Sequence, residues 1–153
     1  MFRGVNAINL DTKGRVALPT RYRDLVQMLC KGQMIVTIDT EEQCLLLYPL
    51  DEWETIEKKI EALPSFNRAA RRIQRLLIGH AAELELDSQG RLLIPGKLRE
   101  YAQLDKKVVL IGQGKKFEVW SELLWEERRQ QWLSEGAAET EDALPADLLT
   151  LSL

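Results

Sequence analysis

Two segments of the chain match one another: residues 10–23, LDTKGRVALPTRYR, lie over residues 86–99, LDSQGRLLIPGKLR, without a gap and at an offset of 76 residues. Leucine, aspartate, glycine, arginine and proline are identical at matching positions. Each segment contains, in the same order, an aspartate, a glycine, an arginine, an apolar run, a proline and a basic stretch. Such self-similarity is the signature of a duplicated structural unit, so the repeat predicts two modules of the same fold.

Each copy opens with residues typical of a tight β-turn. The aspartate can cap the turn through its side chain, and the glycine accepts a positive φ. Apolar residues predict strands before the turn at 5–10 and 82–86, and returning strands at 16–18 and 92–94. We therefore expect each copy to begin with a β-hairpin.

A proline follows each returning strand and predicts the start of a short helix. Pro19 and Pro95 cannot continue a strand ladder but suit the first turn of a helix, which favours helices over 20–29 and 96–104. Further strands are predicted at 34–39, 44–48, 107–111 and 117–120, with a turn at 112–115. The predicted order is β-β-α-β-β in both copies, which makes the chain α+β and mostly β.

The two copies are expected to depend on each other for burial. A unit of about 45 residues is marginal as an independent core, so we expect the copies to pack together or to interlock, for example by exchanging hairpins. Helices are predicted at 51–63 and 67–78 and from 121 onward, with an exposed acidic tail after Glu135. The expected domains are a first module at 5–52, a helical connection at 53–80, a second module at 81–124, and a helix with its tail at 125–153.

Charge is unevenly distributed along the chain, although the net charge is only −3. Residues 1–25 hold five basic and two acidic side chains, whereas residues 121–153 hold two basic and eight acidic ones. A basic face on an acidic protein is compatible with binding to phosphates. The first residues lack the apolar run of a signal peptide, and no stretch is apolar enough for a membrane helix, so we expect a cytoplasmic protein without a membrane partner. Cys30 and Cys44 are expected as reduced, partly buried thiols.

The chain resembles the MraZ family of bacterial transcriptional regulators from Met1 to about Trp125, in four features. These are the paired LDTKGR and LDSQGR motifs, the paired PTRYR and PGKLR segments, CLLLYPLDEWE at 44–54 and RRIQRLLIGHA at 71–81. The resemblance implies a duplicated AbrB-like swapped-hairpin β-barrel with connecting and C-terminal helices, assembled into a ring-shaped homo-oligomer. It also implies a nucleoid-associated regulator, expected to be a repressor, that binds repeated G-rich boxes upstream of the division and cell-wall gene cluster, its own promoter included.

The side chains expected to contact double-stranded DNA lie around the first turn and on the strand before it. Arg15 directly follows the turn and can form paired hydrogen bonds with guanine. Lys13 and Arg3 are expected to contact phosphates, with solvated surface charge as the alternative. The alternative for Arg15 is a salt bridge to Asp11 that stiffens the hairpin, and both hold if Asp11 orients Arg15.

The matching pair in the second copy is Arg91 with Asp87. Gln89 stands where the first copy has Lys13, which removes a positive charge beside Arg91. Because phosphate contacts scale with charge, this difference favours a structural bridge in the second copy. We expect the first copy to be the main DNA contact.

Other arginines are expected to have different roles. Arg21 and Arg23, in the first predicted helix, are expected as solvated side chains or as partners of neighbouring acids, with DNA contact as the alternative. The predicted helix 67–78 is amphipathic, with a basic face that is expected to form salt bridges between subunits, or alternatively to contact phosphates. The basic face consists of Arg68, Arg71, Arg72 and Arg75, and the opposite face of Ala69, Ile73, Leu76 and Leu77.

Enzyme motifs are missing from the sequence, which contains no GxSxG, P-loop, GxGxxG or HExxH pattern. His80 has no nucleophile or carboxylate partner at motif spacing, so we expect a structural, hydrogen-bonding histidine. We therefore expect no catalytic site, no metal, no cofactor and no small-molecule substrate. The rival hypothesis is an oligomeric protein-interaction or antitoxin-like module, in which the hairpins mainly dimerise.

Overall fold

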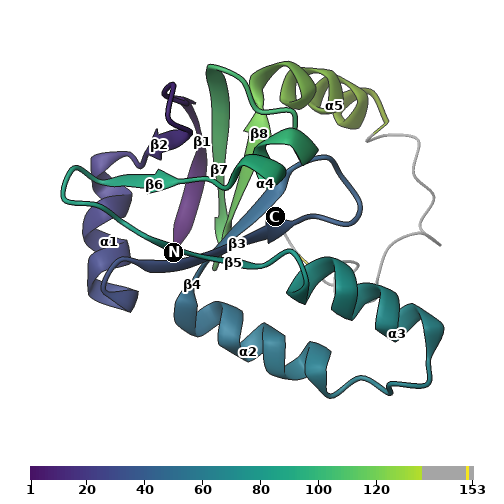
Figure 1. Ribbon diagram of the computed structural model, residues 1–153. Helices are drawn as coiled ribbons and strands as arrows, with labels where there is room; N and C mark the ends of the chain where they lie inside the picture. The colour runs from purple at the N-terminus through teal and green to yellow at the C-terminus, as the bar shows by residue number, and fades with distance from the viewer. Residues whose placement is uncertain (136–150, 152–153) are drawn as a thin grey trace. The chain divides into compact units, whose positions relative to one another are not determined.

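The computed structural model describes residues 1–135 and 151, and both copies follow the predicted order of elements (Figure 1). The first copy forms β1 (Phe2–Asn9), β2 (Arg15–Ala17), α1 (Thr20–Cys30), β3 (Gln33–Ile38) and β4 (Leu45–Pro49). The second forms β5 (Ala82–Glu85), β6 (Arg91–Leu93), α4 (Gly96–Tyr101), β7 (Lys107–Gly114) and β8 (Phe117–Ser121). The connection forms α2 (Leu50–Glu61), α3 (Arg68–Ile73) and the π-helical η1 (Gln74–Ile78), and α5 (Glu122–Glu135) follows the second copy.

The two prolines lie at the strand-to-helix junctions, as predicted. Pro19 and Pro95, with φ of −53° and −57°, are the N-cap residues of α1 and α4. The first helix ends at a left-handed C-cap, Lys31, with φ 55°, and after α4 the chain turns at Gln103, with φ 54°. The second helix ends at Tyr101, before the predicted limit of 104.

The two copies are joined through their strands rather than packed as separate modules. A six-stranded antiparallel sheet has the order β1-β7-β8-β4-β3-β5, and β2 pairs with β6 in a separate ribbon. The first strand of each copy pairs with the third strand of the other, since β1 lies beside β7 and β5 beside β3. The copies also meet where β4 pairs with β8 and β2 with β6. The expected interlocking of the copies is therefore built into the backbone hydrogen bonds.

Two expectations about the strands are wrong. The larger sheet begins at β1 and ends at β5, so the described strands do not close into the expected β-barrel. The predicted hairpins persist only at their tips: beyond the turn, β1 and β2 share one isolated bridge, between Leu10 and Val16. The two strands then diverge, because each completes its backbone hydrogen bonds on a strand of the other copy.

The larger core combines side chains of both copies. Phe2 and Phe117 stack with ring centroids 4.2 Å apart, and Tyr22 meets Phe117 edge-on at 5.0 Å. Val16 and Leu92, from the inward face of the β2–β6 ribbon, are fully buried in the same cluster. Neither copy could bury its apolar face without the other.

A smaller buried cluster holds α2 against the sheet. Trp53 of α2 packs beside Ile35 and Tyr48, and the rings of Tyr48 and Trp53 have centroids 5.7 Å apart. The Thr37 hydroxyl donates a hydrogen bond of 2.6 Å to the carbonyl oxygen of Leu77, which ties η1 to β3. These contacts attach the connecting helices to the strands of the first copy (Figure 1).

The chain divides after Glu122, and α5 lies almost wholly in the C-terminal unit. Within α5, the rings of Trp125 and Trp132 meet edge-on with centroids 5.9 Å apart. The acidic tail expected after Glu135 lies outside the described residues, apart from Leu151. Across residues 1–135 and 151, no helix is long and apolar enough to cross a membrane.

Phe2→Ala is expected to lower the free energy of unfolding by about 3–5 kcal/mol, because it empties the aromatic cluster between the copies. Urea denaturation followed by circular dichroism measures this loss. The matched control is Val5→Ala, on the same strand at a side chain that is 60% exposed, which should cost less than about 1 kcal/mol. Equal losses for the two variants would contradict a shared core centred on Phe2.

Candidate nucleic-acid interface

The first D-x-x-G-R turn is held by a single aspartate. The Gly14 amide donates to the Asp11 carbonyl oxygen at 3.0 Å, and the Asp11 amide donates to the Arg15 carbonyl oxygen at 2.9 Å. The Asp11 carboxylate accepts hydrogen bonds of 2.9 Å from the amides of Lys13 and Arg15, both at Oδ1. Its other oxygen, Oδ2, accepts from Arg15 Nε at 2.8 Å. Gly14 has a φ of +90°, which explains the need for glycine in this turn.

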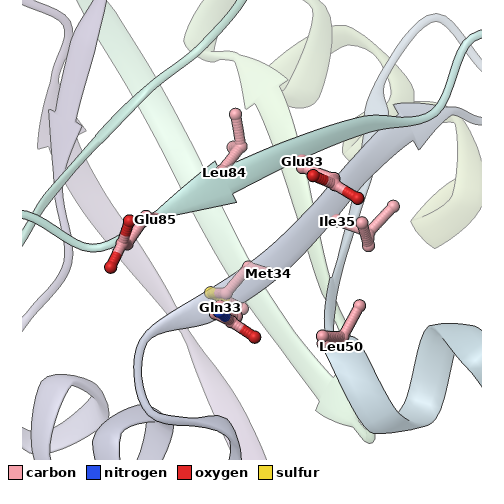
Figure 2. A pocket seen from close by; sticks show the side chains of 7 residues that line it. All are labelled: Gln33, Met34, Ile35, Leu50, Glu83, Leu84 and Glu85. Carbon is pink, nitrogen blue, oxygen red and sulfur yellow. The ribbon is translucent and has the colours of Figure 1, made fainter.

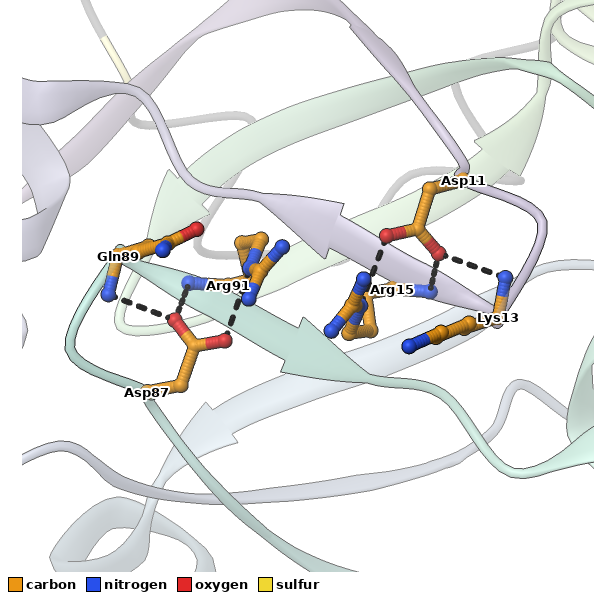
Figure 3. A network of polar contacts seen from close by, with 6 residues as sticks. All are labelled: Asp11, Lys13, Arg15, Asp87, Gln89 and Arg91. Carbon is orange, nitrogen blue, oxygen red and sulfur yellow. Dashed lines mark hydrogen bonds and ion pairs between the residues drawn. The ribbon is translucent and has the colours of Figure 1, made fainter.

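The second turn repeats this geometry (Figure 3). Asp87 Oδ1 accepts from the amides of Gln89 and Arg91 at 2.9 Å, and Asp87 Oδ2 accepts from Arg91 Nε at 2.9 Å. The salt bridge considered as an alternative role for each arginine is therefore present in both copies. Each bridge uses Nε, and within residues 1–135 the terminal Nη nitrogens of Arg15 and Arg91 have no hydrogen-bond partner.

The β2–β6 ribbon brings the two arginines onto one surface. Its register places Arg15 opposite Leu93, Val16 opposite Leu92 and Ala17 opposite Arg91. Since successive residues of a strand point to opposite faces, the buried Val16 and Leu92 place both arginines on the outer face. The arginines are diagonal neighbours across the two strands, and Figure 3 shows them between the two turns. The surface is therefore built by both copies.

The structure places the other predicted contacts at different distances from this surface. Lys13 is exposed in the first turn, and Gln89 is exposed at the matching position of the second. Arg3 lies near the far end of β1, where it pairs with Gln113. About six strand residues separate Arg3 from Asn9 at the turn end of β1, or roughly 20 Å. The structure therefore does not bring Arg3 to the turn.

Two arginines of the first helix make specific contacts. Arg21 is exposed, and its Nη2 donates to Asn6 Oδ1 at 2.7 Å and to the Tyr22 hydroxyl at 2.8 Å. Arg23 was predicted to be solvated or paired with an acid, which is wrong: it is half-buried and its Nε donates to the Leu18 carbonyl oxygen at 2.6 Å. The sequence did contain a signal for this role, because Arg23 matches Arg99 in the repeat.

The arginines of the helical connection are exposed, and the apolar face differs from the predicted one only at its first residue. Ala70 is buried, whereas Ala69, which was predicted on the apolar face, is exposed. Both alanines lie at helical spacing from Ile73 and Leu77, so the sequence pattern alone does not distinguish them. The Asn67 side chain caps α3, and the helix continues as the π-helical η1. Ile73, Leu76 and Leu77 are half-buried, and the exposed arginines are Arg68, Arg71, Arg72 and Arg75.

The turn geometry lowers the pKa of both aspartates. The pKa of Asp11 falls to about 2, chiefly because the Arg15 amide donates to its carboxylate, with further contributions from the Arg15 side chain and the Lys13 amide. The pKa of Asp87 is lowered for the same main reason, the amide of Arg91. Both carboxylates are therefore charged at neutral pH and hold their arginines in place.

Among the described residues, Asp39, Cys44 and Glu118 form a cluster of side chains of the types that bind metal ions. Their potential ligand atoms all lie within 4.8 Å of one another. Burial raises the pKa of the Cys44 thiol, and Cys44 Sγ donates a weak hydrogen bond of 3.5 Å to Asp39 Oδ2. We assign no metal to this cluster. Cys30 and Cys44 are both unpaired and buried, which is more than the partial burial expected.

A hollow of about 330 Å³ lies beside the edge strand β5 (Figure 2). Its walls are side chains of β3 and β5 and Leu50 at the start of α2. Glu83 and Glu85 are its charged side chains, and both are exposed. No serine, cysteine, histidine or lysine accompanies these carboxylates in the lining of the hollow. His80 lies elsewhere, with Nδ1 2.7 Å from the Leu76 carbonyl oxygen, which is the structural hydrogen bond expected for it.

Comparison with known proteins agrees with the two-copy architecture. A family model described as "MraZ protein" and "antitoxin-like" matches the chain twice, over residues 1–76 and 77–146. The chain belongs to the MraZ family. Members named "Transcriptional regulator MraZ" from Legionella pneumophila and Halorhodospira halophila are 60% and 56% identical to it over 153 residues, which is 100% of each chain. Another from Methylococcus capsulatus is 60% identical over 139 residues, or 91% of each chain.

The low pKa of Asp11 can be measured by following its carboxyl carbon in an NMR titration, with a midpoint expected at about 2. Because the pKa is depressed on folding, the contribution of Asp11 to stability is present above its unfolded pKa of 3.8 and is lost as the pH falls through about 2. Arg15→Ala should raise the midpoint only in part, since the amide of residue 15 still donates to the carboxylate. Arg91→Ala is the control and should leave the Asp11 midpoint unchanged; a wild-type midpoint near 3.8 would contradict the turn geometry.

Proposed function

We propose that the chain is a sequence-specific, DNA-binding transcriptional regulator that reads its target through the β2–β6 ribbon. One observation carries this proposal: Arg15 and Arg91 share the outer face of the ribbon, each held by an aspartate through Nε. Relatives that match the whole chain are named transcriptional regulators, which favours this class of function over an enzyme.

The geometry of the arginines suits guanine. Each bridge to aspartate occupies Nε and leaves two Nη nitrogens, which can donate paired hydrogen bonds to O6 and N7 of guanine in the major groove. A two-stranded antiparallel ribbon fits that groove, as it does in other β-ribbon proteins. Fixing the side chain before binding also reduces the entropy lost on contact. This chemistry fits the repeated G-rich boxes that the family resemblance implies.

Other residues contribute to DNA binding in different ways. Lys13 in the first turn and Arg3 on β1 are proposed phosphate contacts, which add affinity and salt dependence but no base preference. Asp11 orients Arg15, and Asp87 orients Arg91. The second pair is proposed as the weaker contact, because Gln89 lacks the charge of Lys13.

We further propose that the chain forms a ring-shaped homo-oligomer of AbrB-like swapped-hairpin modules. One ribbon offers few base contacts, and joined copies raise the effective concentration of the next ribbon at the next box. The exposed arginines of α3 and η1 are the proposed subunit interface, with phosphate contact as their alternative role. The regulator is proposed to act in the cytoplasm at the nucleoid, as a repressor of the division and cell-wall cluster and of its own promoter.

The second candidate function is an antitoxin-like module that binds a protein partner. It is favoured by the antitoxin-like wording of the matching family model. In such a module the paired strands would serve only to assemble the protein. The outer face of the ribbon would then not contact DNA bases. The paired, aspartate-held arginines on that face favour the regulator.

Arg15→Ala is expected to weaken binding to a duplex from the chain's own upstream region at least about fivefold, since one arginine–guanine pair contributes about 1–3 kcal/mol of discrimination. A gel-shift titration measures the affinity, and circular dichroism checks that the fold is kept. Arg91→Ala should cause a smaller loss. Arg129→Ala, which removes an exposed arginine of α5, is the control and should leave the affinity within twofold. Full affinity in the Arg15→Ala variant would refute the ribbon as the reading element.

A further inference from the structure

Each D-x-x-G-R turn is in contact with an arginine of the other copy. Arg99, in α4 of the second copy, lies against Gly14 of the first turn. Arg23, in α1 of the first copy, lies against Gly90 of the second turn. The two contacts are equivalent under exchange of the copies, and both arginines are half-buried. The contact is therefore a feature of the duplicated module and occurs at both turns.

At the first turn, two hydrogen bonds and one packing contact link Gly14, Ile94 and Arg99. The Ile94 amide donates to the Gly14 carbonyl oxygen at 2.9 Å, and Arg99 Nε donates to the Ile94 carbonyl oxygen at 3.0 Å. The guanidinium then lies directly on the backbone of Gly14, so close that a Cβ added there would be 2.6 Å from Arg99 Cζ. Gly14, Ile94 and Arg99 together form what we call the first latch.

The second latch has the same three parts. The Leu18 amide donates to the Gly90 carbonyl oxygen at 2.9 Å, and Arg23 Nε donates to the Leu18 carbonyl oxygen at 2.6 Å. A Cβ added at Gly90 would be 2.6 Å from Arg23 Cζ. In both latches the glycine serves twice, since it adopts a positive φ and leaves room for the guanidinium.

The position of each arginine follows from the proline at the start of its helix. Arg23 and Arg99 lie four residues after Pro19 and Pro95, and their amides donate to the carbonyl oxygens of those prolines at 3.3 Å and 3.0 Å. The side chain therefore extends from the first helical turn back over the preceding strand. A planar guanidinium can cover the glycine while Nε donates to a carbonyl oxygen, and a lysine ammonium cannot do both.

We propose that Arg23 and Arg99 are positioning residues, each of which holds the DNA-reading turn of the opposite copy in its binding geometry. This inference rests on the proposed function for its effect on DNA, but the contact itself does not. Arg99 sets the first turn, which carries Lys13 and Arg15, and Arg23 sets the second turn, which carries Arg91. Substitution of the positioning arginine in one copy is therefore expected to weaken the DNA contact made by the turn of the other copy.

Two simpler roles for Arg99 predict different experimental results. If Arg99 only contacted a phosphate, lysine would keep the charge and most of the affinity. If it only supported the general fold, its loss would affect the whole chain rather than one turn. The test therefore uses the charge-conserving variants Arg99→Lys and Arg23→Lys in the full chain, with Arg129→Lys in α5 as the matched control.

The first measurement is hydrogen–deuterium exchange of the two turns without DNA. The amides of Lys13, Gly14 and Arg15 all donate to Asp11, so their exchange reports on the first turn. Arg99→Lys is expected to speed their exchange at least fivefold and to leave the turn at 87–91 unchanged. Arg23→Lys is expected to do the opposite, and Arg129→Lys to change neither turn.

The second measurement is affinity for a duplex from the chain's own upstream region, over a range of salt concentrations. Arg99→Lys is expected to weaken binding about tenfold without changing the salt dependence, because the charge is kept. Arg23→Lys should weaken it less than threefold. In the Arg15→Ala background, Arg99→Lys should add less than twofold, since both changes act on one contact.

The exchange results decide the proposal separately from the proposed function. Unchanged exchange in both turns, a change in the turn of the same copy, or faster exchange over the whole chain would each overturn the latches. Unchanged DNA affinity in Arg99→Lys, with wild-type binding intact, would overturn the positioning role. If the unaltered chain does not bind the duplex, the proposed function fails while the exchange measurement still tests the latches.

Discussion

The structure depends on backbone hydrogen bonds that pass between the two copies of the repeat. Each copy has too few strands to complete its own ladders, so β1 and β5 pair with the third strand of the other copy, and β2 pairs with β6. Unpaired buried backbone groups are costly, which makes this exchange the condition for folding at all. The shared apolar core follows from it, because the exchanged strands bring side chains of both copies together.

The same exchange builds the candidate DNA-binding surface. The β2–β6 pairing places one arginine from each copy on the outer face of a ribbon whose inner face is buried. The aspartates prepare these arginines within each turn, and Arg23 and Arg99 link each turn to the other copy. Duplication within one chain therefore joins both halves of the surface covalently. It also allows the halves to diverge, as the change from Lys13 to Gln89 illustrates.

The sequence predicted what depends on neighbouring residues and missed what depends on distant ones. The turn at Asp11 to Arg15, the helix starts after Pro19 and Pro95, and the aspartate–arginine bridges follow from local chemistry, and all are present. The partner of each strand is a long-range choice, so the sequence could not predict that β1 leaves β2 for β7. The buried Ala70 was missed because Ala69 and Ala70 both lie at helical spacing from Ile73 and Leu77, so tertiary packing decides which of the two is buried. The role of Arg99 was missed because its contact is with Gly14, far away in the chain.

The most direct test of this account is photo-cross-linking from the outer face of the ribbon. Leu93 is 55% exposed and lies opposite Arg15, so p-benzoylphenylalanine at this position should cross-link to a bound duplex from the upstream region. The same group in place of Met28, which is 75% exposed on α1, serves as the comparison. Efficient cross-linking is expected from position 93 and little from position 28. Cross-linking from position 28 that equals or exceeds that from position 93 would refute the ribbon as the DNA-contacting surface.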